Sequence, residues 1–395
     1  MDLVKKILYK VRTKGDNAVL EYNILFDKNP TPTFELTKTQ IKEAYKNVDK
    51  ETLNALKFAA KNIKAFAKAQ NKQLKNFKMK TSFGTIGQNI IPLESVGCYV
   101  PGGRYPLPST ALMTVIPAKV AGVREIIVCS PKISNVVIVA ADLAGANKIF
   151  NVGGVQAIGA MAYGTKQVPK VNKIVGPGNA FVSEAKRTVF GGVGIDFIAG
   201  PSEVLIIADE SANSKFIAAD LLAQLEHDPL AKANLITTSK EIAKQVKIEL
   251  KKQLQELTTK EVAKQSLVNS KIIVVKSILQ AIQLANEIAP EHLELQIQNS
   301  KSVIPKLTNY GSLFVGEQSA EALGDYCLGP NHTLPTSGVA KYSGGLSVFD
   351  FVKIVTIQNI TKPSKKIINC AAKIAEIEGL DAHNKAAKIR LKRVN

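Results

Sequence analysis

The sequence predicts an α/β fold built from two Rossmann-like, parallel-sheet domains, with small helical segments at the N- and C-termini. Two observations lead to this prediction. The 395 residues exceed the roughly 250–300 residues at which a single hydrophobic core stops growing. Between residues 111 and 315, strand-like runs alternate with helical stretches, and the segment Ala-Gly-Pro-Ser at residues 199–202 divides them into two series. Such alternation is typical of parallel sheets.

The chain is expected to begin with helices. Apolar residues recur at three- and four-residue spacing through residues 3–20 and again through residues 41–66, which is the periodicity of an amphipathic helix. Turns and short strands are expected from Phe83 onward. The segment from Ser347 onward is predicted to be helical, and it ends in a basic run at residues 388–393.

The two α/β series can be divided into elements. In the first series, strands are expected at residues 125–129, 148–152 and 173–175, and helices at residues 111–122, 136–145 and 156–163. In the second series, strands are expected at residues 204–207, 234–237, 271–275 and 312–315, and helices at residues 215–227, 240–257 and 277–288. No residue-level repeat relates the series, so their duplication is a structural hypothesis.

Composition argues against several classes of protein. The net charge is +19, but the lysines are spread along helical stretches with acidic residues between some of them, and the few aromatic residues are not interleaved with them. This pattern disfavours nucleic-acid binding, and steering of an anionic dinucleotide is a simpler use of the charge. The longest charge-free stretch, residues 149–165, is broken by glycines and is too short to span a membrane.

The cysteines and the first residues indicate the compartment. The four cysteines, Cys98, Cys129, Cys327 and Cys370, are far apart and form no CxxC pair. A disulfide framework or a thiolate zinc site is therefore not expected. Charges in the first six residues disfavour a signal peptide, so a reducing, cytoplasmic location is expected.

Histidine is rare and lies in polar contexts. The chain has four histidines, and His227, His292, His332 and His383 all stand in polar segments, most of them beside an Asp, Glu or Gln. Histidine carries protons near neutral pH and is a common metal ligand. The pattern favours a metal-assisted acid–base site, although any single histidine is more often a core or surface residue.

Three pairings give this site a possible chemistry. Gln224 and His227 are three residues apart at the end of a predicted helix, so both can meet one cation, although coincidence remains an alternative. Glu291 and His292 are adjacent in an irregular or extended segment, so they point to different sides and suit separate proton carriers or a surface dipeptide. Asp325, in a loop-like glycine-rich segment, could complete an N/O metal shell or be a solvated turn residue.

Glycines cluster in three turns of the first series, at residues 99–104, 151–156 and 176–180. Such turns can bring backbone N–H groups against phosphates. None contains a complete G-x-G-x-x-G motif: the nearest has Phe181 in place of the third glycine. No acidic residue lies at the ribose spacing. A standard Rossmann cofactor site is therefore not supported, and simple tight turns remain an equal alternative.

Taken together, the motifs resemble the histidinol dehydrogenase family. The resemblance covers most of the chain, from about Val96 to His383, and the motifs that carry it are at residues 97–103, 176–182, 199–205, 220–227, 290–293 and 324–326. It implies oxidation of L-histidinol through L-histidinal to L-histidine, with two NAD and one water consumed. It also implies one zinc per active site and a homodimer with intertwined subunits.

The resemblance also implies residue roles. Zinc ligands would be Gln224, His227, Asp325 and His383. The catalytic pair would be Glu291 and His292. Substrate contacts would include Ser202 and Glu378 together with His292 and the four zinc ligands. NAD contacts would be Tyr99, Gln156 and Asn179. His383 and Glu378 would serve the site of the neighbouring subunit.

These roles divide the chain into regions. The resemblance implies an N-terminal helical segment at residues 1–23 and a first α/β domain at residues 24–98 and 205–346 that carries the zinc and catalytic residues. It implies a second α/β domain at residues 99–204 that binds NAD, and a C-terminal helical segment at residues 347–395 that reaches the partner subunit.

The residue types fit this chemistry. Zinc would position the imidazole and amine of histidinol, His292 would act as the base for both oxidations, and Glu291 would activate the water that hydrates the aldehyde. Two alternatives stay open: a zinc hydrolase in which Glu291 activates a metal-bound water, and a dehydrogenase for a related amino alcohol. Glu378 near the zinc would favour a cationic or imidazole-bearing substrate.

Overall fold

The computed structural model describes residues 2–102, 105–198 and 200–393. Gly103 and Arg104 of the first glycine cluster, and Ala199 of the segment that separates the two series, lie outside the described residues. The chain forms two compact units. Unit 1 contains residues 1–71 and 93–351, and unit 2 contains residues 72–92 and 352–395. Both predicted α/β series lie in unit 1.

The first sheet of unit 1 is parallel, with the strand order β5-β4-β3-β6-β7. The strands are β3 (Ser95–Tyr99), β4 (Glu125–Cys129), β5 (Lys148–Phe150), β6 (Lys173–Val175) and β7 (Gly194–Ile195). β3 is buried along its whole length because it has a strand on each side and helices over both faces. The three strands predicted for this series are confirmed as β4, β5 and β6, whereas β3 and β7 were not predicted.

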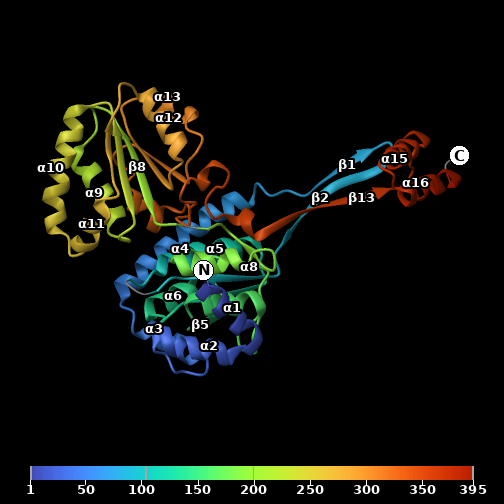
Figure 1. Cartoon of the computed structure of the whole chain (residues 1–395), viewed down its shortest axis with the longest axis horizontal. Coiled ribbons are helices and arrows are strands. Elements are labelled where there is room, and N and C mark those ends of the chain that lie inside the picture. The colour runs from blue at the N-terminus through green and yellow to red at the C-terminus, as the bar shows by residue number, and fades with distance from the viewer. Residues whose placement is uncertain (1, 103–104, 199, 394–395) are drawn as a thin grey trace. The chain divides into compact units, whose positions relative to one another are not determined.

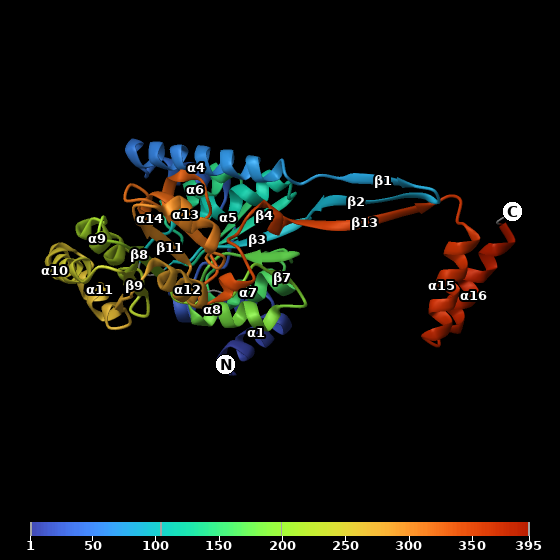
Figure 2. The ribbon, with the colours of Figure 1, turned by 90° about the horizontal axis from the view of Figure 1, so that it is seen from above.

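Helices cover both faces of this sheet (Figure 2). On one side lie α4 (Lys50–Asn71), α5 (Pro108–Ala121) and α6 (Asn135–Ala144). On the other side lie α1 (Asp2–Lys14), α7 (Gly154–Tyr163) and α8 (Ala180–Val189), whose apolar side chains share one core with those of β3, β4 and β6. The remaining N-terminal elements are α2 (Asp16–Tyr22), the π-helix η1 (Asn23–Asp27) and α3 (Lys38–Lys46). The helical prediction for the N-terminal region is confirmed.

The second sheet repeats the topology of the first. It is parallel, with the order β10-β9-β8-β11-β12. Its strands are β8 (Glu203–Ala208), β9 (Lys232–Thr237), β10 (Ile272–Val274), β11 (His292–Gln296) and β12 (Ser312–Val315). In both sheets the first strand in the chain is central, and the order reverses there. The expectation of two related sheet domains is therefore confirmed.

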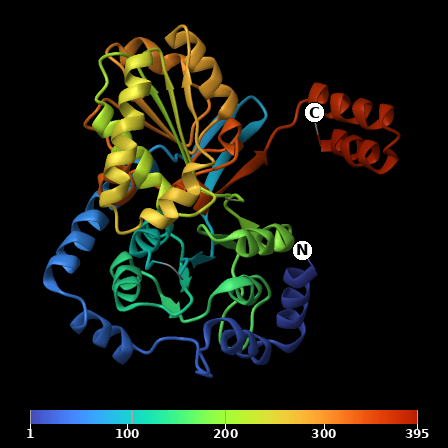
Figure 3. The same cartoon turned by 60° about the vertical axis from the view of Figure 1, so that its left-hand side comes forward.

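Helices also cover both faces of the second sheet (Figures 1 and 3). The yellow helices α9 (Ser214–Leu225), α10 (Lys240–Glu256) and α11 (Lys260–Leu267) lie on one face. The orange helices α12 (Ile278–Ile288) and α13 (Ser300–Val303) lie on the other. Alternate β8 residues enter separate cores, Val204 and Ile206 on the first face and Leu205 and Ile207 on the second, as strand geometry requires.

Short elements complete unit 1. They are η2 (Ile304–Lys306), α14 (Glu321–Leu323), the π-helix η3 (Gly324–Leu328), η4 (Val339–Lys341) and η5 (Val348–Phe351). The loop predicted around Asp325 is therefore a short π-helical turn. Asn62 of α4 donates to the Cys327 carbonyl at 2.8 Å, so α4, which packs on α5 beside the first sheet, also contacts η3.

Unit 2 contains an antiparallel sheet, and here the predicted helix from Ser347 onward is partly wrong. The sheet has the order β1-β2-β13, with β1 (Phe77–Thr81), β2 (Gly84–Pro92) and β13 (Val352–Ile360). β13 pairs with β2 along its whole length. Its many β-branched residues favour a strand, and its partner lies far away in the sequence. Helices α15 (Lys365–Ile377) and α16 (Asp381–Lys388) and the turn η6 (Ile389–Arg393) follow.

All four cysteines are free thiols. Within the part of the chain that the structure describes, no helix combines the length and the apolar character needed to cross a bilayer.

Candidate active site

The residues with catalytic character gather at the amino ends of β8 and β11. His292, the first residue of β11, pairs with Val204 of β8 on one side and with Ser312 of β12 on the other. The C-terminal end of α9 and the α14–η3 segment bring further polar side chains to this edge. Ligands of open α/β sheets usually bind at the carboxyl ends of the strands, so this cluster lies at the opposite edge.

His292 is the centre of the cluster and is 2% exposed. Its Nε2 lies 3.2 Å from Asp325 Oδ1, and its Nδ1 lies 3.4 Å from the Glu203 carbonyl oxygen. Carboxyl oxygens of Glu291 and Glu321 lie 3.7 and 3.8 Å from Nδ1. Burial alone would lower the pKa of His292, but the charges of Glu321, Asp325 and Glu291 outweigh it and hold this pKa well above its ordinary value.

Glu291 is buried beside His292. Its Oε2 accepts a hydrogen bond from the Glu203 backbone N–H at 2.9 Å. Burial raises the pKa of Glu291 to about 8, and the charges of Asp325 and Glu203 act in the same direction, although His292 partly opposes them. Glu291 and His292 are therefore both buried, and burial and neighbouring charges shift the pKa of each; their role as proton carriers stays a prediction.

Gln224 and Glu321 contact each other next to this pair. In the amide orientation that satisfies its neighbours, Gln224 donates to Glu321 Oε1 at 2.5 Å and accepts from the Glu203 N–H at 2.8 Å. Glu321 was missed by sequence reasoning. Its spacing from Asp325, four residues in a helical segment, is the signal that could have indicated it, because residues at that spacing share a helix face.

The remaining predicted ligands in unit 1 lie close by. Asp325 is largely buried; burial would raise its pKa, but His292, His332 and His227 reverse this and lower it. His227 follows the end of α9 and is exposed, yet desolvation of its ring by the surrounding protein lowers its pKa against the opposing charge of Asp325. A lower pKa keeps the imidazole neutral, which is the form that binds metals.

His332 supports Asp325 from behind. Its Nδ1 lies 2.9 Å from the Asp325 backbone carbonyl, and its Nε2 lies 3.4 Å from the Thr110 hydroxyl of α5. Because a carbonyl oxygen only accepts, Nδ1 carries the proton in this arrangement. His332 thus connects α5, beside the first sheet, with the turn η3 that carries Asp325.

A row of buried polar side chains continues from His292 along β11. Glu294 and Gln296 follow at alternate positions and are 1% and 3% exposed, so they share the face of His292. Burial raises the pKa of Asp220, on α9, to about 6 and that of Glu294 to about 8. Among the described residues, none donates a hydrogen bond to Glu294 Oε1 or Glu321 Oε2. Sequence reasoning missed this row, although polar residues alternate with leucines in the strand.

The donor set fits a divalent cation. Ligand atoms of His292, Glu321 and Asp325 lie within 4.8 Å of one another, and the Gln224 amide contacts Glu321. These nitrogen and oxygen donors suit zinc and similar ions. Burial raises the pKa of Glu291 and Glu321, and Glu321 Oε2 has no hydrogen-bond partner among the described residues, so a bound cation would favour the ionised form of both carboxyl groups. Of these residues, Asp325 and Gln224 were predicted ligands, whereas His292 and Glu321 were not.

Three predicted site residues form none of the contacts described above. Ser202 directly precedes β8, and its carbonyl accepts from the Lys232 N–H at 3.0 Å. Glu378, after α15, and His383, on α16, are exposed residues of unit 2, whereas the other ligands belong to unit 1. The roles of all three stay predictions.

The predicted NAD contacts gather at the carboxyl edge of the first sheet. Tyr99 ends β3, and its hydroxyl accepts from the Gly154 N–H at 3.1 Å. Gln156, in the first turn of α7, donates to Asn23 at 3.3 Å, while its Oε1 is buried without a partner among the described residues. Asn179 caps α8 by accepting from Phe181 N and Val182 N at 3.1 Å each. The structure thus brings the three residues to one edge, at the end of β3 and at the starts of α7 and α8.

Comparisons with known proteins agree with one another. A family model described as histidinol dehydrogenase matches residues 1–391. The histidinol dehydrogenase of Aquifex aeolicus (strain VF5) is 48% identical over 392 residues, which cover 98% of this chain and 91% of that protein. That of Listeria innocua serovar 6a is 48% identical over 400 residues, covering 99% and 93%.

A solved structure gives the same result for the fold. The crystal structure of histidinol dehydrogenase from Elizabethkingia anophelis matches with a TM-score of 0.95 and 39% sequence identity, covering 99% of this chain and 92% of that chain. The chain therefore belongs to the histidinol dehydrogenase family, oxidoreductases that oxidise histidinol in histidine biosynthesis.

Proposed function

We propose that the chain oxidises L-histidinol to L-histidine through L-histidinal, with two NAD as hydride acceptors and one zinc per site. The observation that supports this proposal best is the buried pair Glu291 and His292 beside Asp325 and the Gln224 amide. Two oxidations with a hydration between them need a base and a group that activates water. This pair can supply both.

His292 is the proposed base for both oxidations. Its Nδ1 faces the Glu203 carbonyl, an acceptor only, so that nitrogen keeps its proton and Nε2 is the one that loses and gains a proton. Because neighbouring carboxylates hold the pKa of His292 well above its ordinary value, Nε2 must first release its proton before the ring can act as a base. In the first oxidation, Nε2 takes the hydroxyl proton of histidinol as the carbon-bound hydrogen leaves as hydride to NAD. During hydration it gives that proton to the aldehyde oxygen, and in the second oxidation, neutral again, it takes a hydroxyl proton of the hydrated aldehyde.

Glu291 is the proposed activator of water between the two oxidations. Its ionised carboxylate takes a proton from water as the oxygen adds to the aldehyde carbon. The hydrogen bond from the Glu203 N–H fixes one carboxyl oxygen. With a pKa of about 8, Glu291 can gain and lose a proton near neutral pH, as a general base must.

Gln224, His227 and Asp325, with His383 from the neighbouring subunit, are the proposed zinc ligands. Zinc, when bound, holds the imidazole and amine of histidinol. Ser202 and Glu378 are the proposed further substrate contacts, and Glu378 also comes from the neighbouring subunit. Glu321 is not a proposed ligand; its contact with the Gln224 amide fixes the orientation of a ligand instead.

The proposed site residues are divided between the two sheet domains. The domain around β8 and β11 carries the zinc and catalytic residues, and the domain around β3 and β6 carries the NAD contacts Tyr99, Gln156 and Asn179. We infer a homodimer in which Glu378 and His383 serve the site of the neighbouring subunit, as the family resemblance implies, and a cytoplasmic location, which suits the four free thiols. We expect the net charge of +19 to steer the anionic dinucleotide and expect no nucleic-acid partner.

The direct test is stoichiometry. Purified protein with zinc, NAD and limiting L-histidinol should form two NADH for each histidinol consumed, with L-histidine as the product. One NADH per histidinol would contradict the second oxidation. No NADH, with hydrolysis of an ester analogue instead, would favour a zinc hydrolase.

A second test separates the two catalytic roles. Glu291→Gln should slow oxidation of supplied L-histidinal far more than oxidation of L-histidinol, because only the aldehyde requires hydration. The control is Glu287→Gln, which changes an exposed glutamate nearby and should leave both rates intact. Equal losses in both half-reactions would remove Glu291 from the hydration step.

A further inference from the structure

We propose that the buried ion pair between Lys186 and Asp196 positions the turn at residues 176–179 for NAD and thereby sets the affinity of the enzyme for NAD. The inference rests on the proposed NAD site at Tyr99 and Asn179. Neither Lys186 nor Asp196 belongs to the residues that contact substrate or cofactor in that proposal, so their role is one of positioning.

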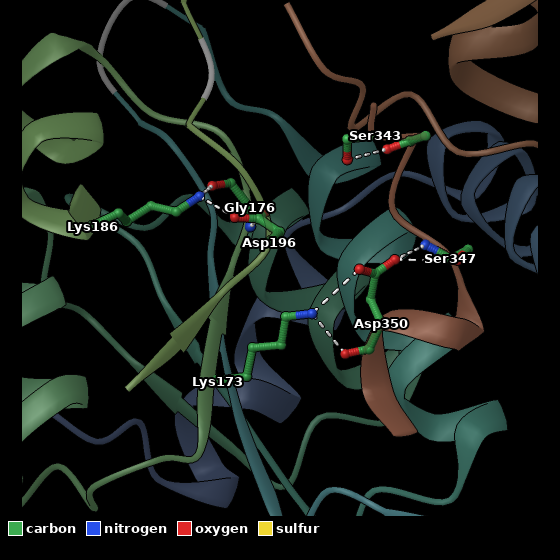
Figure 4. Close-up of polar contacts among 8 residues, drawn as sticks. Lys173, Gly176, Lys186, Asp196, Ser343, Ser347 and Asp350 are labelled. Carbon is green, nitrogen blue, oxygen red and sulfur yellow. Dashed lines mark hydrogen bonds and ion pairs between the residues drawn. The ribbon is translucent and has the colours of Figure 1, made fainter. Parts of the chain in front are cut away.

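The pair holds both polar groups of one glycine (Figure 4). Lys186 donates to the Gly176 carbonyl at 2.8 Å, and Asp196 accepts from the Gly176 N–H at 2.8 Å. The Lys186 ammonium also forms an ion pair with Asp196. The exposed fractions of the two side chains are 2% and 0%, so the interaction is shielded from solvent.

Gly176 is held from a third side by Tyr99. A Cβ at position 176 would lie 2.1 Å from the Tyr99 carbonyl oxygen, and the glycine has a φ of 111°. No other residue fits this close approach without strain. The backbone of Gly176 therefore packs against Tyr99, one proposed NAD contact, and begins the turn that leads to Asn179, another.

The pair also closes a loop around that turn. Gly176 follows β6, the chain continues through Pro177 and Gly178 to Asn179, which caps α8, and Lys186 of α8 bonds back to Gly176. Asp196, directly after β7, fixes the other side. A turn with two glycines loses much conformational freedom on ordering, and these contacts fix it before the ligand arrives.

Stability alone does not account for the pair. Removing two charges from water is expensive, and apolar residues of similar volume often replace a buried ion pair without loss of stability. What an apolar pair cannot do is bind both the N–H and the carbonyl of Gly176. The charges are therefore explained by the geometry that they impose on the turn.

The experiment compares an apolar double variant with the wild type. Lys186→Met combined with Asp196→Leu removes both charges, so that neither is left buried and unpaired. A second double variant, Lys186→Met with Asp196→Val, comes closer to the volume of the Asp side chain and likewise offers no acceptor to the Gly176 N–H; it is measured if the first does not fold. The matched control is Lys173→Met on strand β6. It removes a different ion pair, in which Lys173 Nζ lies 3.3 Å from Asp350 Oδ1, and leaves the contacts of the turn in place.

NAD affinity is measured by calorimetry without histidinol, and KM for NAD and for histidinol by NADH formation. A displacement of about 1 Å can cost about 100-fold, so we expect KM for NAD to rise by about 10- to 100-fold in the folded double variant. kcat should change much less, and KM for histidinol and zinc content should not change. Lys173→Met should keep the wild-type KM for NAD.

Two results would overturn the proposal. One is a folded double variant whose NAD affinity stays within about twofold of wild type, a change of only about 0.4 kcal/mol. The other is a parallel rise of both KM values, which would indicate general distortion. Failure of the underlying function looks different: the wild type itself would bind no NAD in the calorimeter.

Discussion

Glu291→Gln should make the folded state more stable at high pH, and the structure gives the size of the effect. Burial raises the pKa of Glu291 from its ordinary value of 4.5 to about 8. The unfolded chain therefore ionises this carboxyl group first, and the wild type loses stability as pH rises from about 4.5 to about 8. At about 1.4 kcal/mol per pH unit, the loss reaches roughly 5 kcal/mol. Gln cannot ionise, yet it keeps an oxygen to accept the Glu203 N–H.

The assay is urea unfolding, followed by circular dichroism, of the metal-free wild type and variant at about pH 5, 7 and 9. The variant should match the wild type near pH 5 and exceed it by up to roughly 5 kcal/mol near pH 9. The exposed neighbour Glu287 is changed to Gln as the control and should give no pH-dependent difference. If the difference in free energy of unfolding between variant and wild type stays constant or shrinks as pH rises, the raised pKa of a buried Glu291 is refuted.

Three further predictions concern the same cluster. Glu321→Gln removes the carboxylate that contributes most to raising the pKa of His292, so the acid limb of kcat/KM for histidinol should move to lower pH, while Glu317→Gln, an exposed control, should leave it in place. His332→Leu leaves the Asp325 backbone carbonyl without its hydrogen-bond donor at 2.9 Å and should lower the free energy of unfolding in urea by about 1–3 kcal/mol. An unchanged unfolding midpoint would contradict a stabilising hydrogen bond between His332 and Asp325. Dialysis against a chelator should abolish turnover of histidinol, and zinc should restore it; full activity in protein shown to be metal-free by elemental analysis would contradict the ligand assignment.

Local patterns in the sequence were sufficient for most helices and for most strands of the two parallel sheets, but not for the inner strands β3 and β11. Runs such as residues 125–129 carry their own periodicity and composition, and they form β4 as predicted. Strand β13 was missed because its sequence lies next to helical segments and carries no local signal of the strand with which it pairs. Its partner β2 lies in residues 84–92, and only the folded chain brings the two together.

The site shows the same limit. Glu291 and His292 stand out in the sequence because a rare residue type lies beside an acid. Glu321 and Glu294 do not stand out, since acidic residues are common and usually solvated. Only the packing of α9 and α14 against the polar face of β11 reveals that both are buried and that both act on His292.

By itself, the order of residues determined the α/β class, the two series of strands and helices, and the motifs that carry the family resemblance, because each depends on residues close together in the chain. Tertiary structure alone decided that the acid–base cluster forms at the amino ends of β8 and β11, and that Lys186 and Asp196 fix the backbone of Gly176. Both outcomes depend on the order of strands in the sheets and on the exclusion of water from the side chains, and both of these arise only when distant segments have packed together.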